Sequence, residues 1–417
     1  FGELHWAGVN PAEAGVGEGE GESVSSLSSE AERTSNLNVL VGPNMSGKSA
    51  LLQAIAIALN PHVRHFVNSM GPRIRDEDVR RISDPHQLSR RVSGPVEIEA
   101  RFKVGDRSVT SRVTRDASVN ARTRWAETRD VVRVAGELSD AHAAGEPLPI
   151  VAMYGTQRLW LGVSRTRRRM GNEWSDGYLD CLDPRSTYEV VRKWANVTTR
   201  SLGRKSSGGR PERSLGLLHD LVRIVLHPVG ITDVDYVLDE DDFFAEVTQA
   251  MLADVSTWSD IWSDRWEQMW LPVSSLSDGV RTMVGLVGDI ARRISLLNAG
   301  LPGVDLRETP GIIMIDEVDL HLHPVWQQQV LATLCEALPN VQWIVTTHSP
   351  QVVSTAPRTS VWVLDAQRDE EGRKRADAWV MTHPQQQTEG VDSGDVLAQV
   401  FQVDPMPDTF WRRLLAE

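Results

Sequence analysis

The sequence predicts an α/β fold with a mostly parallel core sheet that is flanked by helices. Three apolar runs, 37–41, 312–315 and 342–347, have the composition of strands that are buried on both faces. Helix-forming residues follow the first run, and one predicted helix, 325–338, joins the second run to the third. Such a β-α-β unit brings its strand ends to the edge of the sheet where ligands bind in folds of this class.

The first apolar run leads into a phosphate-binding loop. Residues 42–49 fit G-x-x-x-x-G-K-[ST] without a mismatch, and a helix is expected over 50–59, ending at Asn60-Pro61. A glycine turn between a strand and a helix directs backbone N–H groups at a triphosphate. We therefore expect Lys48 to contact the β- and γ-phosphates of ATP and Ser49 to bind Mg²⁺. The predicted nucleotide-binding residues of this loop are Gly42, Pro43, Asn44, Met45, Ser46, Gly47, Lys48, Ser49 and Ala50.

The second apolar run ends in two acids, Asp316 and Glu317. Two carboxylates at the end of a buried strand are costly unless a cation or hydrogen bonds meet them, and a Mg²⁺–nucleotide complex supplies that cation. Asp316 is placed to hold Mg²⁺ or its water, and Glu317 to accept a proton from the attacking water. The alternatives are a chance glycine turn at 42–49 and an ordinary pair of acids at a strand end. Both alternatives are weakened because the two motifs occur in one chain.

Two further stretches favour a ligand site at the same sheet edge. The third apolar run ends at His348, which the β-α-β unit brings near the acids, although a histidine at a strand end is most often structural. The stretch 276–279 opens a predicted helix that runs to Leu297. Ser277 at a helix start, with Gly279 two residues later, presents a hydroxyl and free N–H groups to an anion, or is simply a helix cap.

The remaining segments predict an insertion and a helical section. Alternating residues over 96–113 indicate a β-hairpin, and 131–134 and 149–154 are predicted as two more strands, so that an antiparallel sheet is inserted at about 62–150. A helical section is expected over 158–274. We therefore divide one composite ATPase domain into 1–157, 158–274 and 275–417.

Composition excludes several classes of protein. The 417 residues contain 24% charged residues and only two cysteines, Cys181 and Cys335, which argues against a disulfide framework or zinc site and favours the cytoplasm. No apolar run is long enough to span a membrane. The net charge of −13 argues against a basic nucleic-acid coat but leaves local DNA contacts open. Candidates for such contacts are Arg165, Arg167, Arg168, Arg169, Arg204, Lys205, Arg210 and Arg213, with solvated loops as the alternative.

Together these stretches resemble ABC-type ATPases of the SMC, RecF and OLD branch. The order of motifs matches: phosphate loop, Gln157 at the Q-loop position, the LSDG signature at 276–279, the Walker B acids Asp316 and Glu317, and the switch histidine His348. Stretches 315–324 and 346–353, and the tail from 388 to 401, are similar to stand-alone bacterial defence ATPases, which include the ATPase subunit of the Septu antiviral system.

The resemblance implies a P-loop NTPase fold of the ABC or SMC-head type that binds ATP and Mg²⁺ and hydrolyses ATP. It implies that Ser49, Gln157 and Asp316 hold the metal, and that Lys48, Glu317 and His348 take part in catalysis. It also implies a head-to-tail dimer or a higher oligomer, in which Ser277 and Gly279 of one subunit contact the nucleotide of the other and Asp319 crosses between subunits.

In function, the resemblance implies an ATPase subunit of a Septu-like defence complex, whose nucleotide-driven dimerisation controls an effector nuclease such as an HNH protein. A DNA repair or recombination ATPase of the RecF or SMC type, a non-hydrolysing ATP-gated scaffold and a transporter motor remain alternatives. Glu317 argues against the scaffold because the base is present. A methionine at position 45 makes the phosphate loop similar to that of MutS, but the LSDG segment does not fit the MutS family. Only roughly 70 residues follow His348, so we expect no nuclease domain of ordinary size there.

Overall fold

A computed structural model of the chain gives its structure. It describes residues 36–404 apart from 68–70, 79–80, 84–89, 93–94, 105–106, 117, 119–120, 127, 158–173, 186–187, 204–207, 249–267 and 369–373. In this part of the chain no helix is both long and apolar enough to cross a lipid bilayer.

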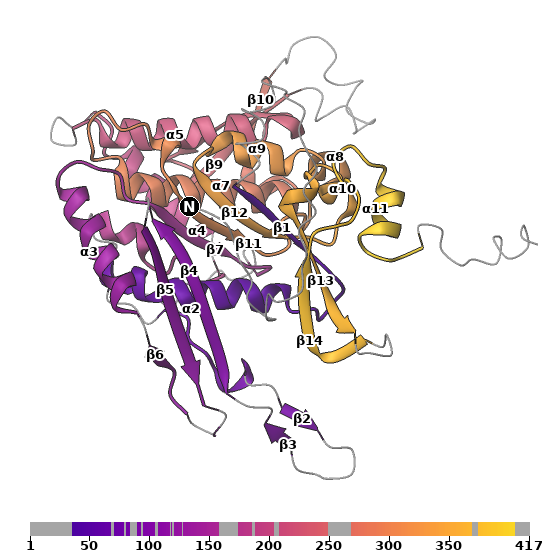
Figure 1. Cartoon of the computed structure of the whole chain (residues 1–417). Coiled ribbons are helices and arrows are strands. Elements are labelled where there is room, and N and C mark those ends of the chain that lie inside the picture. The colour runs from indigo at the N-terminus through magenta and orange to yellow at the C-terminus, as the bar shows by residue number, and fades with distance from the viewer. Residues whose placement is uncertain are drawn as a thin grey trace, which may run out of the picture.

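The core is a six-stranded sheet with the order β14-β13-β1-β12-β11-β7 (Figure 1). The five strands from β13 to β7 run parallel, and only the edge strand β14 is antiparallel. This confirms the predicted mostly parallel sheet. The strands are β1 (Leu37–Val41), β7 (Ile150–Tyr154), β11 (Gly311–Ile315), β12 (Val341–Thr346), β13 (Val361–Arg368) and β14 (Lys374–Thr382).

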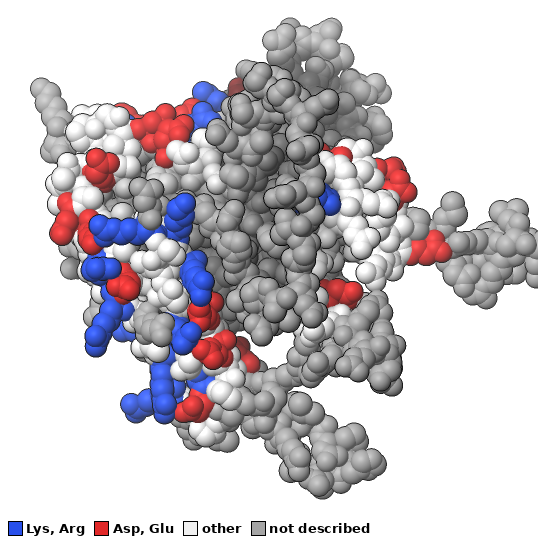
Figure 2. All heavy atoms as spheres, viewed as in Figure 1, with Lys and Arg blue, Asp and Glu red and all other residues white. Residues whose placement is uncertain are grey.

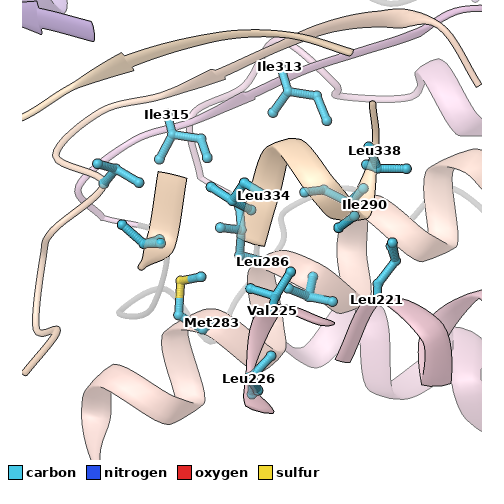
Figure 3. Packing of buried hydrophobic residues seen from close by; sticks show 14 of the residues in the cluster. Leu221, Val225, Leu226, Met283, Leu286, Ile290, Ile313, Ile315, Leu334 and Leu338 are labelled. Atoms are coloured by element: carbon cyan, nitrogen blue, oxygen red, sulfur yellow. The ribbon is translucent and has the colours of Figure 1, made fainter. Parts of the chain in front are cut away.

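Alternate residues of each core strand pack on opposite faces of the sheet. Ile313 and Ile315 of β11 belong to the larger apolar cluster, where Figure 3 shows them near Leu286 and Leu334. Met314 lies in a second cluster, formed largely with α2. Because both faces are buried, the strands are apolar throughout instead of alternating. The first face is covered by α4 (Tyr188–Thr199), α5 (Arg210–Val225), α7 (Asp278–Asn298) and α9 (Val330–Ala337), and the second by α2 (Lys48–Phe66).

An antiparallel lobe follows α2, as predicted, but it is smaller than expected. It comprises β4 (Val96–Val104), β5 (Arg107–Arg115) and β6 (Arg124–Ala126). Figure 2 shows Lys and Arg side chains gathered over this lobe and α3 (Arg129–Ala143), with acids among them.

Short elements occur in this region and elsewhere among the described residues. They are η1 (Asp76–Asp78), β2 (Arg81–Ser83), β3 (Arg90–Val92), η2 (Trp174–Tyr178), η4 (His227–Val229), η5 (Val273–Ser275), η6 (Leu306–Glu308), α8 (Pro324–Gln327), α10 (Pro350–Val353), η7 (Arg358–Ser360) and α11 (Ser393–Gln399).

Of two further strands predicted for the lobe, one is wrong and the other belongs to a different sheet. Residues 131–134 lie in α3, where Val131 and Val134, three residues apart, pack on Val109 of β5. That spacing is helical, but a window of four residues does not distinguish it from a strand. Residues 150–154 do form a strand, β7, but it joins the core sheet beside β11.

Two predicted element boundaries are also wrong. The helix expected to end at Asn60 continues through Pro61 to Phe66. A proline inside a helix costs about 3 kcal/mol, and the burial of Leu59, Pro61 and Val63 offsets that cost. The helix expected over 325–338 is split into α8 and α9.

The section predicted as helical, 158–274, contains α4 and α5 but also a three-stranded antiparallel sheet. Its strands are β8 (Ile231–Val237), β9 (Asp242–Thr248) and β10 (Gln268–Pro272). Alternate residues of β9, Phe243, Ala245 and Val247, are buried. This period of two was visible in the sequence and should have predicted a strand.

Two of the proposed DNA-contacting arginines have a structural role instead. Arg210 donates to the carbonyl of Leu296 (2.9 Å), and Arg213 donates to those of Ala299 (2.8 Å), Leu301 and Val304. The carbonyls of Leu296 and Ala299 lie at the carboxyl end of α7, where unpaired acceptors and the helix dipole favour a cation, and those of Leu301 and Val304 lie in the segment that follows. The other candidates, residues 165–169, 204 and 205, lie outside the described residues.

A buried ionic cluster joins α7 to β7. The Asp289 carboxylate, 1% exposed, lies 2.7 Å from Arg292 Nη2 and 2.7 Å from Arg293 Nε. It also accepts a hydrogen bond from the Tyr154 hydroxyl (3.0 Å). Burial alone would raise the pKa of Asp289, but Arg292 and Arg293 outweigh burial and hold it well below its usual range. The stabilisation is therefore present above the unfolded pKa, near 4, and declines as the pH falls below it.

We predict that Asp289→Ala lowers the free energy of unfolding by about 3–5 kcal/mol at pH 7, because it leaves two buried guanidinium groups without their counter-ion. Asp278→Ala is the matched control: Asp278 pairs with Arg281 on the same helix, but both side chains are more than 40% exposed. This control should cost about 1 kcal/mol or less. Urea denaturation of the two variants measures the difference, and equal losses would show that the buried cluster does not stabilise the fold.

Candidate functional site

The carboxyl ends of four parallel strands bring the predicted site residues to one edge of the core sheet. The phosphate loop follows β1, Asp316 and Glu317 follow β11, His348 follows β12 by two residues, and Gln157 follows β7 by three. Backbone hydrogen bonds align these ends: Asp316 N–H donates to Tyr154 O (2.8 Å) and Thr347 N–H to Leu40 O (3.3 Å). The sheet therefore places these four segments at neighbouring positions.

The phosphate loop has a buried floor and an exposed crest. Gly42, Ser46 and Lys48 are buried, whereas Pro43, Asn44, Met45, Gly47, Ser49 and Ala50 are exposed. Gly42 has φ +154°, and a Cβ there would lie 2.6 Å from Leu364 O, so only glycine fits. Gly47 is the N-cap of α2 and has φ +93°, in the left-handed region that favours glycine.

Lys48 lies where the loop and the acids meet. Its Nζ donates to Gly42 O (2.9 Å) and Pro43 O (3.1 Å). Burial lowers the pKa of Lys48, while the nearby carboxylates of Asp316 and Glu317 act in the opposite direction. The Ser46 hydroxyl is buried without a partner in the described structure. A buried cation, an orphan hydroxyl and a helix N-terminus fit triphosphate oxygens, and the adjacent carboxylates fit Mg²⁺.

A threonine hydroxyl orders the two acids. The N–H of Glu317 donates to Thr346 Oγ1 (2.8 Å), and that hydroxyl donates to Asp316 Oδ1 (2.6 Å). Asp316 is 8% exposed. This chain of bonds fixes one carboxylate and the backbone of the next residue through a single side chain of β12. Thr346 was not predicted as a site residue, because its place one residue beyond Val345, the last residue of β12 in register with β11, is known only from the strand pairing.

Three residues at this edge have left-handed backbone conformations. Met45 has φ 66°, Glu317 has φ 50° and His321 has φ 64°. Each costs about 1–2 kcal/mol for a residue other than glycine, and such strain is concentrated at functional sites. Met45 is also 97% exposed on the crest of the phosphate loop. The carboxylate of Asp319, in the same loop as Glu317, accepts a hydrogen bond from Thr347 Oγ1 (2.5 Å).

The LSDG segment forms a capped helix start beside the loop after β11. Ser277 is the exposed N-cap of α7, and its Oγ accepts from Val280 N–H at 3.5 Å. Gly279 is buried, and a Cβ there would lie 2.3 Å from His321 O, so the helix start and the loop touch through a glycine. The segments of Ser277 and Asp319, which the resemblance assigns to the contact between subunits, are therefore neighbours in one chain.

Gln157 and His348 lie at the predicted edge as exposed side chains. The structure thus brings the phosphate loop close to Asp316 and Glu317, whose carboxylates interact electrostatically with Lys48. It places His348 after β12 and Gln157 after β7, on either side of β11, without a direct contact to this group among the described hydrogen bonds. Gly279 packs against the backbone of His321, and this close approach connects the helix start at Ser277 to the loop after β11.

Comparison with known proteins gives several partial matches. Residues 203–354 match a family described as AAA domain, putative AbiEii toxin, type IV TA system. A retron Ec83 probable ATPase of Escherichia coli is 48% identical over 94 residues, 22% of this chain and 17% of that protein. The Septu protein PtuA of Bacillus thuringiensis is 33% identical over 94 residues, 22% of this chain and 24% of that protein. The predicted resemblance to bacterial defence ATPases is confirmed.

The matched part is less than a quarter of the length of each of these defence ATPases. Among solved structures, the SMC head domain from Thermotoga maritima is 12% identical, with a TM-score of 0.38 and coverage of 83% of this chain and 89% of that one. The P-loop NTPase fold therefore rests on the strand order, the phosphate loop and the positions of the acids in this chain itself.

We predict that Thr346→Val reduces ATP turnover about tenfold, because Asp316 loses a buried donor and Glu317 loses its backbone partner. A hydrogen bond to a charged group contributes about 1.5–3 kcal/mol. Thr333→Val is the control: Thr333 is a buried threonine whose hydroxyl donates to Val330 O within α9 (3.1 Å). Phosphate release and thermal melting of both variants test this prediction, and a parent-like rate for Thr346→Val would contradict it.

Proposed function

We propose that this chain binds ATP with Mg²⁺ and hydrolyses ATP to ADP and phosphate. The observation that carries the proposal is the meeting of Lys48, Asp316 and Glu317 at the end of the phosphate loop, where a cation and two carboxylates share one sheet edge. The group requires a ligand that presents both phosphate oxygens and a divalent cation, and Mg²⁺–ATP meets that requirement.

Each side chain takes a role that fits its position. Lys48 and the amides of 42–50 hold the phosphates, while Ser49, Asp316 and Gln157 hold Mg²⁺, which neutralises charge as it develops. Glu317 acts as the general base for the attacking water, and its backbone has a left-handed conformation with φ 50°. His348 contacts the γ-phosphate.

We further propose that two subunits associate head to tail with ATP between them, alone or within a higher oligomer. Ser277 caps an exposed helix start, and Met45 projects from the phosphate loop with 97% exposure. Two exposed motif segments on one chain suit an interface in which each completes the site of the partner. Asp319, beside the signature helix, crosses the same interface.

The proposed setting is a cytoplasmic antiviral defence complex in which the nucleotide state of the ATPase controls an effector nuclease, such as an HNH protein. This follows from the relatives, which are named retron ATPases and Septu PtuA. Two free cysteines, Cys181 and Cys335, fit a reducing compartment. Purification from the native host with identification of the co-purifying proteins tests the setting, and a partner set made only of membrane proteins or DNA repair proteins would contradict it.

We predict that Lys48→Ala abolishes ATP binding at the phosphate loop, whereas Glu317→Gln retains binding there and loses turnover. The first change removes the cation that meets the phosphates, and the second keeps the side-chain shape but removes the base. Equilibrium binding and phosphate release on both variants provide the measurement. Hydrolysis by Glu317→Gln at the parent rate would show that another group is the base, and a parent that binds ATP without turnover would favour an ATP-gated scaffold.

We predict that Glu317→Gln with ATP forms a two-subunit particle and that adding Ser277→Arg prevents it, because a large cation then occupies the helix start that faces the partner nucleotide. Ser108→Arg, an exposed position on the lobe, is the control for the added charge. Light scattering with and without ATP measures the mass. A mass that does not respond to nucleotide in either variant would contradict the head-to-tail arrangement.

A further inference from the structure

A basic cavity lies at the end of α2 that is remote from the phosphate loop. It is bounded by the last turns of α2, the segment 71–76, the end of β5 and residues 121–125, and it has a volume of about 710 Å³. Lys48 and Arg64 are sixteen residues apart on α2, which corresponds to roughly 24 Å at 1.5 Å per residue. The cavity is therefore separate from the proposed ATP site, and none of its lining residues belongs to that site.

The charge of the cavity is opposite to that of the chain. Five arginines and one aspartate, Asp76, line it, in a protein whose net charge is −13. The arginines are Arg64, Arg73, Arg75, Arg115 and Arg122. Among the described residues, no acid forms an ion pair with Arg64, Arg73 or Arg122 at 4.0 Å or less, so these three charges are available to an anion.

The floor of the cavity is rigid. Arg115 is 7% exposed, and its Nη1 donates to Ile74 O (2.9 Å) while its Nη2 pairs with Asp76 Oδ1 (2.5 Å). The Thr123 hydroxyl donates to the same carbonyl (3.1 Å). These bonds hold the 71–76 segment against the lobe, so that the arginine side of the cavity is formed before any ligand arrives.

The half-buried ring of Trp125, also in the lining, adds an apolar surface of the kind on which a base stacks.

We propose that this cavity is a second anion site, which binds a small phosphorylated ligand of the nucleotide class. Phosphate oxygens meet the exposed arginines, and the base meets Trp125. The volume, about 710 Å³, is within the range of small-molecule and cofactor sites. Because α2 forms one wall of the cavity and begins at Lys48, a ligand there would fasten the lobe to the same helix that carries the phosphate loop.

The test removes the first site and titrates the second. In the Lys48→Ala protein, ATP, ADP and inorganic pyrophosphate are titrated by calorimetry at low salt. We expect one remaining site, and the further changes Arg73→Gln and Arg122→Gln should together weaken it about 100-fold, at roughly tenfold for each charged contact. Both arginines are exposed, so these changes leave the buried Arg115 contacts intact.

The matched control is Arg101→Gln with Lys103→Gln, which removes two exposed positive charges from β4 in the same lobe without altering the cavity lining. This control should leave the affinity within about twofold of the Lys48→Ala protein, since only nonspecific screening changes. Binding lost equally in both variants would overturn the assignment to the cavity.

Three other results would also overturn the proposal: no binding of any of the three probes by the Lys48→Ala protein at millimolar concentration, undiminished binding after the Arg73 and Arg122 changes, or binding of a ten-nucleotide single strand while the mononucleotides fail. The last result would assign the cavity to nucleic acid instead of a small ligand. None of these results depends on ATP hydrolysis, so the test stands or fails apart from the proposed ATPase activity.

Discussion

Strand β12 pairs in parallel with β1 on one side and with β11 on the other, and the registers Leu40 with Thr346 and Ile315 with Val345 fix where these strands end. Val318 N–H donates to Thr346 O (2.9 Å), while the Thr346 side chain binds the backbone of Glu317 and the carboxylate of Asp316. The phosphate loop and the two acids, to which we assign phosphate and metal binding, are thus aligned by one strand. A slip of one residue in this pairing would turn Thr346 to the opposite face and separate the two halves of the site.

The buried cluster at Asp289 extends this alignment to α7. Tyr154 is the last residue of β7, and its hydroxyl bonds the carboxylate that Arg292 and Arg293 neutralise. Replacing such a cluster with apolar residues is often neutral for stability, so its ionic character is weak evidence that stability is its purpose. It does fix one geometry: the helix that begins at Ser277 is tied to the strand that ends three residues before Gln157. We therefore infer that the cluster holds α7 and β7 in a fixed relative position.

Sequence patterns predicted the parts of the fold that depend on local chemistry. The phosphate loop, the apolar strands and the capped helix at Ser277 each follow from residues within one short window, and the structure has them where the sequence indicated. The predictions that were wrong concern features that depend on contacts with distant parts of the chain. The continuation of α2 through Pro61 depends on burial by distant segments, and the helical nature of 131–134 depends on packing against β5. The contribution of Thr346 could be foreseen only with the strand register, which is a tertiary property.

The two anion sites that we propose lie at the two ends of α2 and differ in origin. At its start, free N–H groups and the positive end of the dipole attract phosphate without many charged side chains. At its end the dipole is negative, which explains a cation such as Arg64 in the last turn without any ligand. That explanation does not extend to Arg73 and Arg122, which come from other segments and converge on the same cavity. The mutual repulsion of these charges is an energetic cost that the helix end cannot offset, and an anion bound among them would.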